Sequence, residues 1–191
     1  MQTDTIKWFF QESADIKIAF GNEYAAAIWE VGTLLAQQLQ LGKKVFIAGN
    51  GGSAADAQHR AAELTGRYKT ERQSLGGIAL TTDTSALTAI GNDYGFDHIF
   101  AKQLAGLAQE GDIFVGISTS GNSANIIEAV KVAKNRKITT LLLLGKDGGK
   151  LKGMGDWEFI VPSDNTPRIQ ECHQTLYHTL CEIIDEVCAS R

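Results

Sequence analysis

From about residue 42 onward, the chain alternates between short apolar runs and longer amphipathic stretches. The runs are nearly all apolar, as is typical of parallel strands buried on both faces. They are Lys44–Ala48, Gly77–Leu80, Ile113–Ile117, Thr139–Leu144 and Trp157–Val161. Helical patterns of about 10 to 15 residues separate most of them, which indicates βαβ units. The expected fold is α/β: a three-layer α-β-α sandwich around a parallel sheet of these five strands.

The residues before this alternation have a helical period. Residues 3–20 and 22–41 are predicted to form two amphipathic helices, with Gly21-Asn22 between them and Gly42 as the stop. Only two prolines occur, and no Ser/Gly/Pro-rich linker divides the chain. We therefore expect one domain over residues 1–191, with an N-terminal helical extension (1–41) and an α/β core with a C-terminal helix (42–191).

Composition narrows the classes of function. The 191 residues carry a formal charge of −4 without a Lys/Arg cluster, so a nucleic-acid partner is not expected. Apolar runs are shorter than the roughly 18 residues of a membrane span, and residues 1–5 do not resemble a secretory signal. We expect a cytoplasmic protein that does not bind membranes. Three cysteines near the C-terminus lack CxxC spacing and are expected to pack a helix.

A loop rich in hydroxyl groups is the most informative local feature. Residues 118–123 (Ser-Thr-Ser-Gly-Asn-Ser) follow a predicted strand and precede the helical pattern Ala124–Asn135. The first N–H groups of a helix lack partners and lie at the positive end of its dipole, which favours an anion. Because the loop contains no Lys or Arg, neutral donors are expected to bind a small phosphorylated metabolite that is later released.

A second loop is expected at the same edge of the sheet. Residues 49–53 (Gly-Asn-Gly-Gly-Ser) follow the first strand, and Ser53 with Asp56 forms a capping-box pattern that predicts a helix start. Ligands of such sheets bind beyond the carboxyl ends of the strands, where the strand order reverses. The loop also fits a loose dinucleotide fingerprint, but the acidic residue required downstream is not cleanly placed, since Asp83 is the nearest. A nucleotide-dependent oxidoreductase is therefore a distant alternative.

Two predicted helices carry candidate ligands for a metal or a substrate. His59 and Glu63 are four residues apart and so share one helix face. On the C-terminal helix, Gln170, Gln174 and His178 form a polar stripe along an otherwise apolar pattern. A surface His/Glu pair is often only a weak contact, so the stripe adds weight to the functional interpretation.

The spacing on the C-terminal helix limits how its ligands act together. Gln170 and His178 are separated by about 12 Å along a helix axis, a distance that one zinc ion spans only at full stretch. We therefore favour a site shared between subunits over a site within one chain. His173 lies off the stripe and is expected to be structural.

Taken together, these motifs resemble the sugar isomerase (SIS) domain family, and within it the bacterial phosphoheptose isomerases. The resemblance covers essentially the whole chain. The matching segments are Gly49–Ser53, His59, Glu63–Tyr68, Gly91–Phe96, Ile117–Asn125, Gly145–Gly149, Arg168–Glu171 and His178. One departure is Ala54-Ala55, where the family often has His and Cys; these positions are not expected ligands, so the departure bears on substrate fit.

The resemblance implies an isomerase that converts sedoheptulose 7-phosphate to D-glycero-D-manno-heptose 7-phosphate through an enediol(ate), for nucleotide-activated heptose of lipopolysaccharide or surface polysaccharide. It implies a homotetramer with active sites at subunit interfaces. It also implies one Zn²⁺ per subunit, held by His59, Glu63, Gln170 and His178. The implied substrate-binding residues are Asn50, Gly51, Gly52, Ser53, Glu63, Asn92, Asp93, Ser118, Thr119, Ser120, Ser123 and Gln170.

By the same resemblance, Glu63 is the expected base and His178 the expected acid. For Asp93, a plain turn residue in Gly91-Asn92-Asp93 competes with a role in substrate binding. The alternative from another class is a non-catalytic SIS-domain protein that binds the bacterial replication initiator. That protein lacks the full metal and acid–base set, whereas this chain has all four residues, which favours the isomerase.

Overall fold

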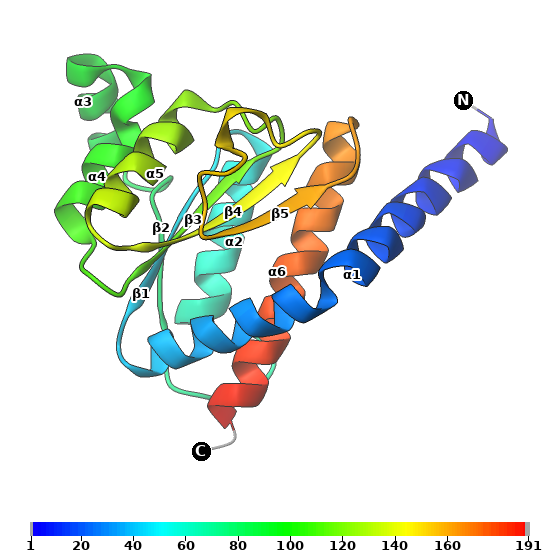
Figure 1. Cartoon of the computed structure of the whole chain (residues 1–191), viewed down its shortest axis with the longest axis horizontal. Coiled ribbons are helices and arrows are strands. Elements are labelled where there is room, and N and C mark those ends of the chain that lie inside the picture. Colours follow the sequence, from blue (N-terminus) through cyan, green and yellow to red (C-terminus); the bar gives the residue numbers. More distant parts are fainter. Residues whose placement is uncertain (1, 190–191) are drawn as a thin grey trace.

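A parallel sheet forms the centre of the molecule (Figure 1). The structure is a computed structural model, and it describes residues 2–189. The sheet has five strands in the order β2-β1-β3-β4-β5, and every neighbouring pair is parallel. The strands are β1 (Lys44–Ala48), β2 (Gly76–Ala79), β3 (Ile113–Ser118), β4 (Thr139–Gly145) and β5 (Trp157–Val161). The predicted parallel sheet is confirmed, with strand ends within one residue of expectation.

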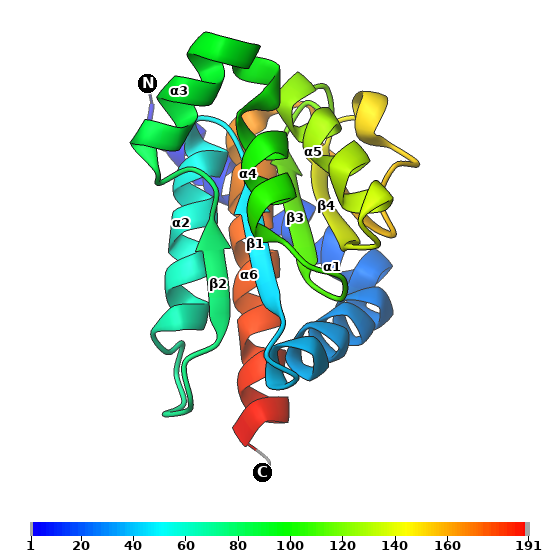
Figure 2. The same ribbon diagram turned by 90° about the vertical axis from the view of Figure 1, so that its left-hand side faces the viewer.

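Helices cover both faces of the sheet, as Figures 1 and 2 show. They are α1 (Thr3–Gln40), α2 (Gly52–Thr65), α3 (Thr84–Tyr94), α4 (Ile99–Leu107), α5 (Ala124–Asn135) and α6 (Thr166–Ala189), with short 3-10 turns η1 (Phe96–His98) and η2 (Gly149–Leu151). Alternate strand residues enter two separate cores: Val45 and Ile47 pack with α1, α2 and α6, whereas Phe46 and Ala48 pack with α4 and α5. The three-layer sandwich is therefore confirmed.

The N-terminal region corrects one expectation. Instead of two helices separated at Gly21-Asn22, α1 is a single helix of 38 residues. Phe20, Tyr24 and Ile28 lie four residues apart and pack against one core, so both sides of the glycine present the same buried face. A glycine inside a helix costs only about 1 kcal/mol, and this continuous packing outweighs it. The first part of α1 projects beyond the body (Figure 1).

The described residues include no helix that is both long and apolar enough to span a bilayer. Cys172 and Cys181 are buried on α6, and Cys172 and Cys188 pack with the core that α1, α2 and α6 form on one face of the sheet. These positions agree with the expected role of the cysteines in helix packing.

Candidate active site

The glycine-rich loop after β1 and the serine-rich loop after β3 lie side by side, because β1 and β3 are neighbours in the sheet. The strand order reverses between them, which is where open α/β sheets bind ligands. The side chains of Asn50 and Asn125 join the loops through two reciprocal amide hydrogen bonds of 2.9 Å each. The two predicted loops therefore form one cradle, named here the anion cradle (residues 49–53 and 118–123).

Hydrogen bonds within the serine-rich loop hold its hydroxyl groups in place. Ser118 Oγ and Ser123 Oγ are 2.9 Å apart, and the N–H of Asn122 donates to Ser120 Oγ at 3.2 Å. Gly121 has a φ of +65° and its backbone lies so close to Gly148 that a Cβ would clash with the carbonyl oxygen of that residue. The side chain of Ser123 does not cap α5, so its hydroxyl, besides its bond to Ser118, can contact a ligand beside the first N–H groups of the helix.

Helices α2 and α6 run side by side away from the cradle, and they contact each other at successive helical turns. Gln170 lies against Gly52, with Nε2 only 2.5 Å from where a Cβ on residue 52 would be. One turn later, Gln174 Nε2 donates to Asp56 Oδ1 at 3.2 Å. A side chain at position 52 would therefore displace the amide group of Gln170 from its present place. The pairing carries the polar faces of both helices toward each other.

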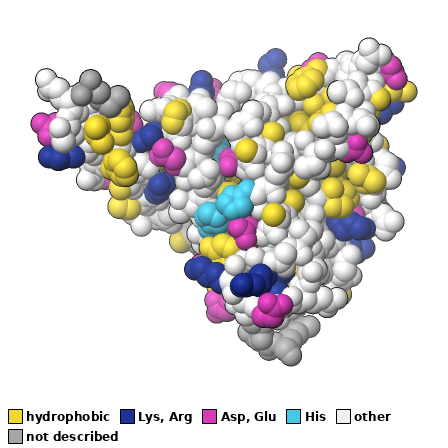
Figure 3. Space-filling model, turned by 180° about the vertical axis from the view of Figure 1, so that it is seen from behind, with side chains coloured by type: hydrophobic (Ala, Val, Ile, Leu, Met, Phe, Trp, Pro, Cys, Tyr) yellow, Lys and Arg dark blue, Asp and Glu magenta, His cyan; other side chains and the backbone are white. Residues whose placement is uncertain are grey.

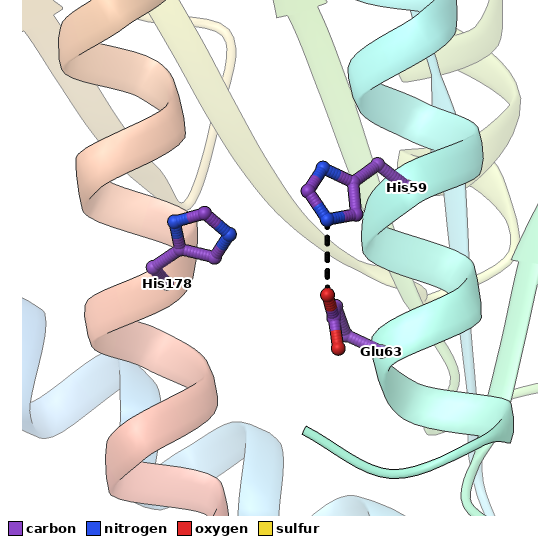
Figure 4. A group of neighbouring side chains, drawn as sticks. All are labelled: His59, Glu63 and His178. Carbon is purple, nitrogen blue, oxygen red and sulfur yellow. Dashed lines mark hydrogen bonds and ion pairs between the residues drawn. The ribbon is translucent and has the colours of Figure 1, made fainter. Parts of the chain in front are cut away.

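Farther along this pair of helices, His59 and Glu63 of α2 face His178 of α6 (Figure 4). His59 Nε2 and Glu63 Oε1 are 2.9 Å apart, and the rings of His59 and His178 lie 5.4 Å apart in an edge-on arrangement. One ligand atom from each residue lies within 4.8 Å of the others. Solvent reaches the group, because the side chains of His59 and Glu63 are 49% and 20% exposed. Figure 3 shows histidine side chains beside acidic ones at the surface.

The three donors suit a divalent cation. Imidazole nitrogen and carboxylate oxygen are common zinc ligands at about 2 Å, so donors of one ion lie within about 4 Å of one another. The group needs only small side-chain adjustments to meet this geometry. Burial, and then the neighbouring His59, lower the pKa of His178, which favours the neutral imidazole that binds metals. All three side chains belong to one chain, so their convergence does not require a second subunit.

The other residues expected in the site lie outside this group of three. Gln170 lies against the cradle, two helical turns before His178. Asn92 and Asp93 are exposed and bond to each other at 2.8 Å. They belong to the last turns of α3, so of the two interpretations of Asp93 the plain turn residue is wrong. Figure 2 shows α3 at the same end of the molecule as the start of α2.

The capping box expected at the start of α2 is also wrong. Gly51 is the N-cap residue, and no side chain caps this end. Asp56 is buried and accepts from Gln174 of α6 instead, because the packing of the two helices removes this carboxylate from the helix end. Ser53 is buried as well, and the amide of Asn50 is paired with Asn125, so the side chains of this loop are less open to a ligand than expected.

The aromatic and charged residues around the cluster were not singled out from the sequence. The hydroxyl of Tyr177 hydrogen-bonds to His59 Nδ1, and Tyr68 stacks on His178 with ring centroids 5.8 Å apart. Arg60 is buried with its guanidinium carbon 5.7 Å from the centre of the Tyr177 ring. A polar residue between His59 and Glu63 on a helix otherwise packed by alanines was the one available hint.

Residues 8–145 match the family described as the SIS domain. The phosphoheptose isomerase of Aquifex aeolicus (strain VF5) is 52% identical over 188 residues, which cover 98% of either chain. The structure of the phosphoheptose isomerase from Neisseria gonorrhoeae is similar with a TM-score of 0.90 and 48% identity, over 96% of this chain and 98% of that one. That of the Francisella tularensis enzyme gives 0.92 and 42%, over 97% and 100%.

Proposed function

The chain belongs to the SIS domain family, and from this premise we propose that it is an aldose–ketose isomerase that converts sedoheptulose 7-phosphate to D-glycero-D-manno-heptose 7-phosphate. The observation that carries the proposal is the convergence of His59, Glu63 and His178 on one surface group. High identity to phosphoheptose isomerases over nearly the whole chain supports the same substrate. The full cluster favours this function over binding of a replication initiator. The product would supply nucleotide-activated heptose.

The separation between cradle and cluster fits a long sugar phosphate. His59 follows Gly52 by about two helical turns, or roughly 10 Å along α2. This length is on the scale of an extended seven-carbon chain with a phosphate at one end and a carbonyl at the other. The phosphate would bind to Ser118, Thr119, Ser120, Ser123 and the backbone of residues 50–53, with Gln170, Asn92 and Asp93 toward the hydroxyl groups.

Isomerisation moves a carbonyl from C2 to C1 and needs two proton transfers. Glu63 takes the proton from C1, which leaves an enediol(ate), and returns it to C2. His178 moves a proton between the oxygens on C1 and C2, because a neutral imidazole accepts at one nitrogen and donates at the other. No co-reactant is consumed. Both side chains are partly exposed at the cluster and can reach a substrate.

We propose that His59, Glu63, Gln170 and His178 hold one Zn²⁺ per subunit, with Gln170 supplied by a neighbouring subunit, because Gln170 of the same chain lies against Gly52, two helical turns from His178. Such an ion, when bound, would polarise the carbonyl and stabilise the negative charge that develops on oxygen. Metal binding weakens Glu63 as a base because it lowers the pKa of the carboxylate. Either Glu63 leaves the ion when the substrate binds, or the ion is structural. Zinc titration separates these cases, since a structural ion raises the melting temperature but leaves kcat of the folded enzyme unchanged.

The test of the proposed function is turnover of sedoheptulose 7-phosphate by the purified protein, with and without a chelator. We expect conversion that is lost on chelation and restored by Zn²⁺. Glu63→Gln should reduce kcat by about 10²- to 10⁴-fold, since it removes the general base. Glu128→Gln, which removes a carboxylate paired with Lys131 on α5, is the matched control. A wild-type protein without turnover, or a fully active Glu63→Gln variant, contradicts the proposal.

We also propose a homotetramer with active sites at subunit boundaries. The projecting part of α1 exposes large apolar side chains, among them Ile6, Trp8 and Phe10 at 47%, 54% and 76%. A mostly apolar groove of about 330 Å³ lies between α1 and α6, with Phe20 and Leu176 in its lining. Exposed apolar surface of this kind is typical of contacts between proteins. A second copy of the chain would cover both features.

A further inference from the structure

Behind the cluster lies a buried polar layer that the proposed mechanism does not use. Asp56, Arg60, His173 and Tyr177 are exposed by 5%, 3%, 1% and 1%. Arg60 Nη1, Asp56 Oδ2 and His173 Nδ1 lack hydrogen-bond partners in the structure. Burying polar groups costs free energy unless they are well paired, so stability alone does not explain the part of this layer that lies against His59. It lies directly against the ring of His59.

Tyr177 is the member of this layer that contacts the cluster. Its hydroxyl bonds to His59 Nδ1, while Nε2 of the same ring is 2.9 Å from Glu63. Both nitrogens of His59 are therefore engaged, and the orientation of the ring is fixed. The Tyr177 ring also packs edge-on against His59 at 5.3 Å and lies 4.5 Å from His178. One buried side chain thus contacts both histidines.

The position of Tyr177 is itself fixed from behind. Its ring is buried, and the Arg60 guanidinium lies 5.7 Å from the ring centre. A cation near an aromatic face is attracted by the electron-rich π system. Asp56, four residues before Arg60 on the same helix face, is held by Gln174. The tyrosine therefore has little freedom to follow His59 if that ring rotates.

The two tautomers of His59 require a partner at Nδ1 that can both donate and accept a hydrogen bond, and a hydroxyl group does both. With Nε2–H donating to Glu63, Nδ1 is an acceptor and the tyrosine O–H donates to it. With the Nε2 lone pair directed at a cation, Nδ1 carries the proton and donates to the tyrosine oxygen. A hydroxyl both donates and accepts, whereas the ring of phenylalanine does neither. Metal-bound histidines nearly always have a hydrogen-bond acceptor on the other nitrogen.

We propose that Tyr177 is a positioning residue that fixes the ring and the tautomer of His59 for cation binding. The inference rests on the proposed zinc-dependent function and extends it to a residue outside the ligand set. The test is the Zn²⁺ affinity of the metal-free protein, measured by competition with a chelating dye. Tyr177→Phe should bind Zn²⁺ about 10- to 100-fold more weakly than wild type. Its kcat should recover when Zn²⁺ is raised, with KM for the sugar phosphate unchanged.

Tyr24→Phe is the matched control, because it removes the hydroxyl of a half-buried tyrosine packed on Phe20 and Phe159, away from the cluster. Its Zn²⁺ affinity should equal that of wild type. Equal affinity of Tyr177→Phe and wild type overturns the inference and leaves the proposed function intact. A wild-type protein that does not bind Zn²⁺ overturns the proposed metal site and the inference with it.

A measurement on the wild type covers the case in which Tyr177→Phe does not fold. The ring nitrogens of His59 are observed by ¹⁵N NMR in the zinc-loaded protein and identified with His59→Gln. We expect a protonated, hydrogen-bonded Nδ1 and a coordinated Nε2. Coordination through Nδ1, or an Nδ1 without a proton, overturns the inference.

Discussion

At the scale of single residues, the pair Asn50 and Asn125 joins the two loops of the anion cradle. Each amide donates to the other, so replacing Asn125 by Asp puts an acceptor where a donor is needed and adds negative charge beside the phosphate position. An unsatisfied buried group costs about 1–3 kcal/mol. We expect KM for the sugar phosphate to rise about 10-fold with kcat nearly unchanged. Asn135→Asp, at the far end of α5, is the control, and equal KM values would contradict a role in joining the loops.

His173 is confirmed as a structural residue rather than a ligand. It is buried, and its Nε2–H donates to the carbonyl oxygen of Leu144 at 2.9 Å. Burial, partly opposed by this bond, lowers the pKa of His173 to about 4. The role expected from its place off the polar stripe was therefore correct.

The lowered pKa of His173 makes stability depend on pH. An unfolded chain protonates this histidine near pH 6.5, whereas the folded chain does so only near 4. The free energy of unfolding should be highest above about pH 6.5, where His173 is neutral in both states. It should decrease as the pH falls toward 4, because the unfolded chain then binds a proton that the folded chain does not. Urea unfolding at a series of pH values should show a shallower decrease for His173→Gln than for wild type. The control, His98→Gln, should keep the wild-type slope, and identical slopes for both variants would refute the assignment.

Residue-level prediction succeeded where chemistry and helix spacing were enough. His59, Glu63 and His178 could be selected because four-residue spacing and a polar stripe are visible in the sequence. Tyr177 and Arg60 could not be selected, because their roles depend on the register of α2 against α6. The same register turned Asp56 from an expected capping residue into a partner of Gln174.

At the scale of elements, hydrogen bonds hold residues 66–75 to both α2 and α6. Asp185 accepts hydrogen bonds from the backbone N–H groups of Lys69 and Thr70 and from Arg72 Nε. Arg72 also donates to the carbonyl oxygens of Glu63 and Leu64 at the end of α2. The ion pair is buried, with both side chains 5% exposed. It therefore fixes the helix turn that carries the proposed base.

Asp185→Asn should destabilise the fold strongly, because the amide nitrogen faces a donor and the Arg72 charge loses its partner. Breaking a buried pair in this way costs about 3–5 kcal/mol, measured by urea unfolding at pH 7. Asp15→Asn, at an exposed position of α1, should leave stability unchanged. A loss below about 1 kcal/mol would show that the pair acts as a surface ion pair.

The same carboxylate predicts sensitivity to acid. Burial opposes ionisation of Asp185, but the hydrogen bonds from Thr70, Arg72 and Lys69 outweigh it and lower its pKa. Its contribution is present above the unfolded value of about 3.9 and is lost as the pH falls through the lowered folded value. Unfolding free energies measured below about pH 4 should therefore decline less steeply in Asp185→Asn than in wild type, and parallel curves would contradict this role.

The observed ends of α1 and of the strands after it show which boundaries the hydrophobic pattern predicts. Buried parallel strands are nearly continuous apolar runs, so their ends were predicted closely. The helix break predicted at Gly21 was wrong because glycine is only a local signal. Phe20 and Tyr24 both pack against Phe159 of the sheet, and this long-range contact cannot be seen in the local sequence. Tertiary packing overrides propensity in such places.

At the scale of the whole molecule, the order β2-β1-β3-β4-β5 brings the two loops together. The βαβ pattern predicted parallel strands, but not which strands are neighbours, because that choice depends on which face each helix covers. Here α2 crosses on one face while α4 and α5 lie on the other. The position of the two loops after their strands predicted that both lie at one edge of the sheet, whereas their direct contact is a consequence of the strand order.

The projecting part of α1 gives the test of the proposed assembly (Figure 3). Trp8 and Phe10 expose 54% and 76% of their surface, and burial of apolar area contributes about 25 cal/mol per Å². The double variant Trp8→Glu/Phe10→Glu should therefore elute with a smaller mass than wild type in gel filtration with light scattering. Its turnover should fall with the mass if neighbouring subunits complete the sites.

Lys7→Glu, an exposed charge change on the same helix, should keep the wild-type mass. A wild type with the mass of one chain would contradict the tetramer, and a dissociated variant with full activity would contradict sites at the boundaries.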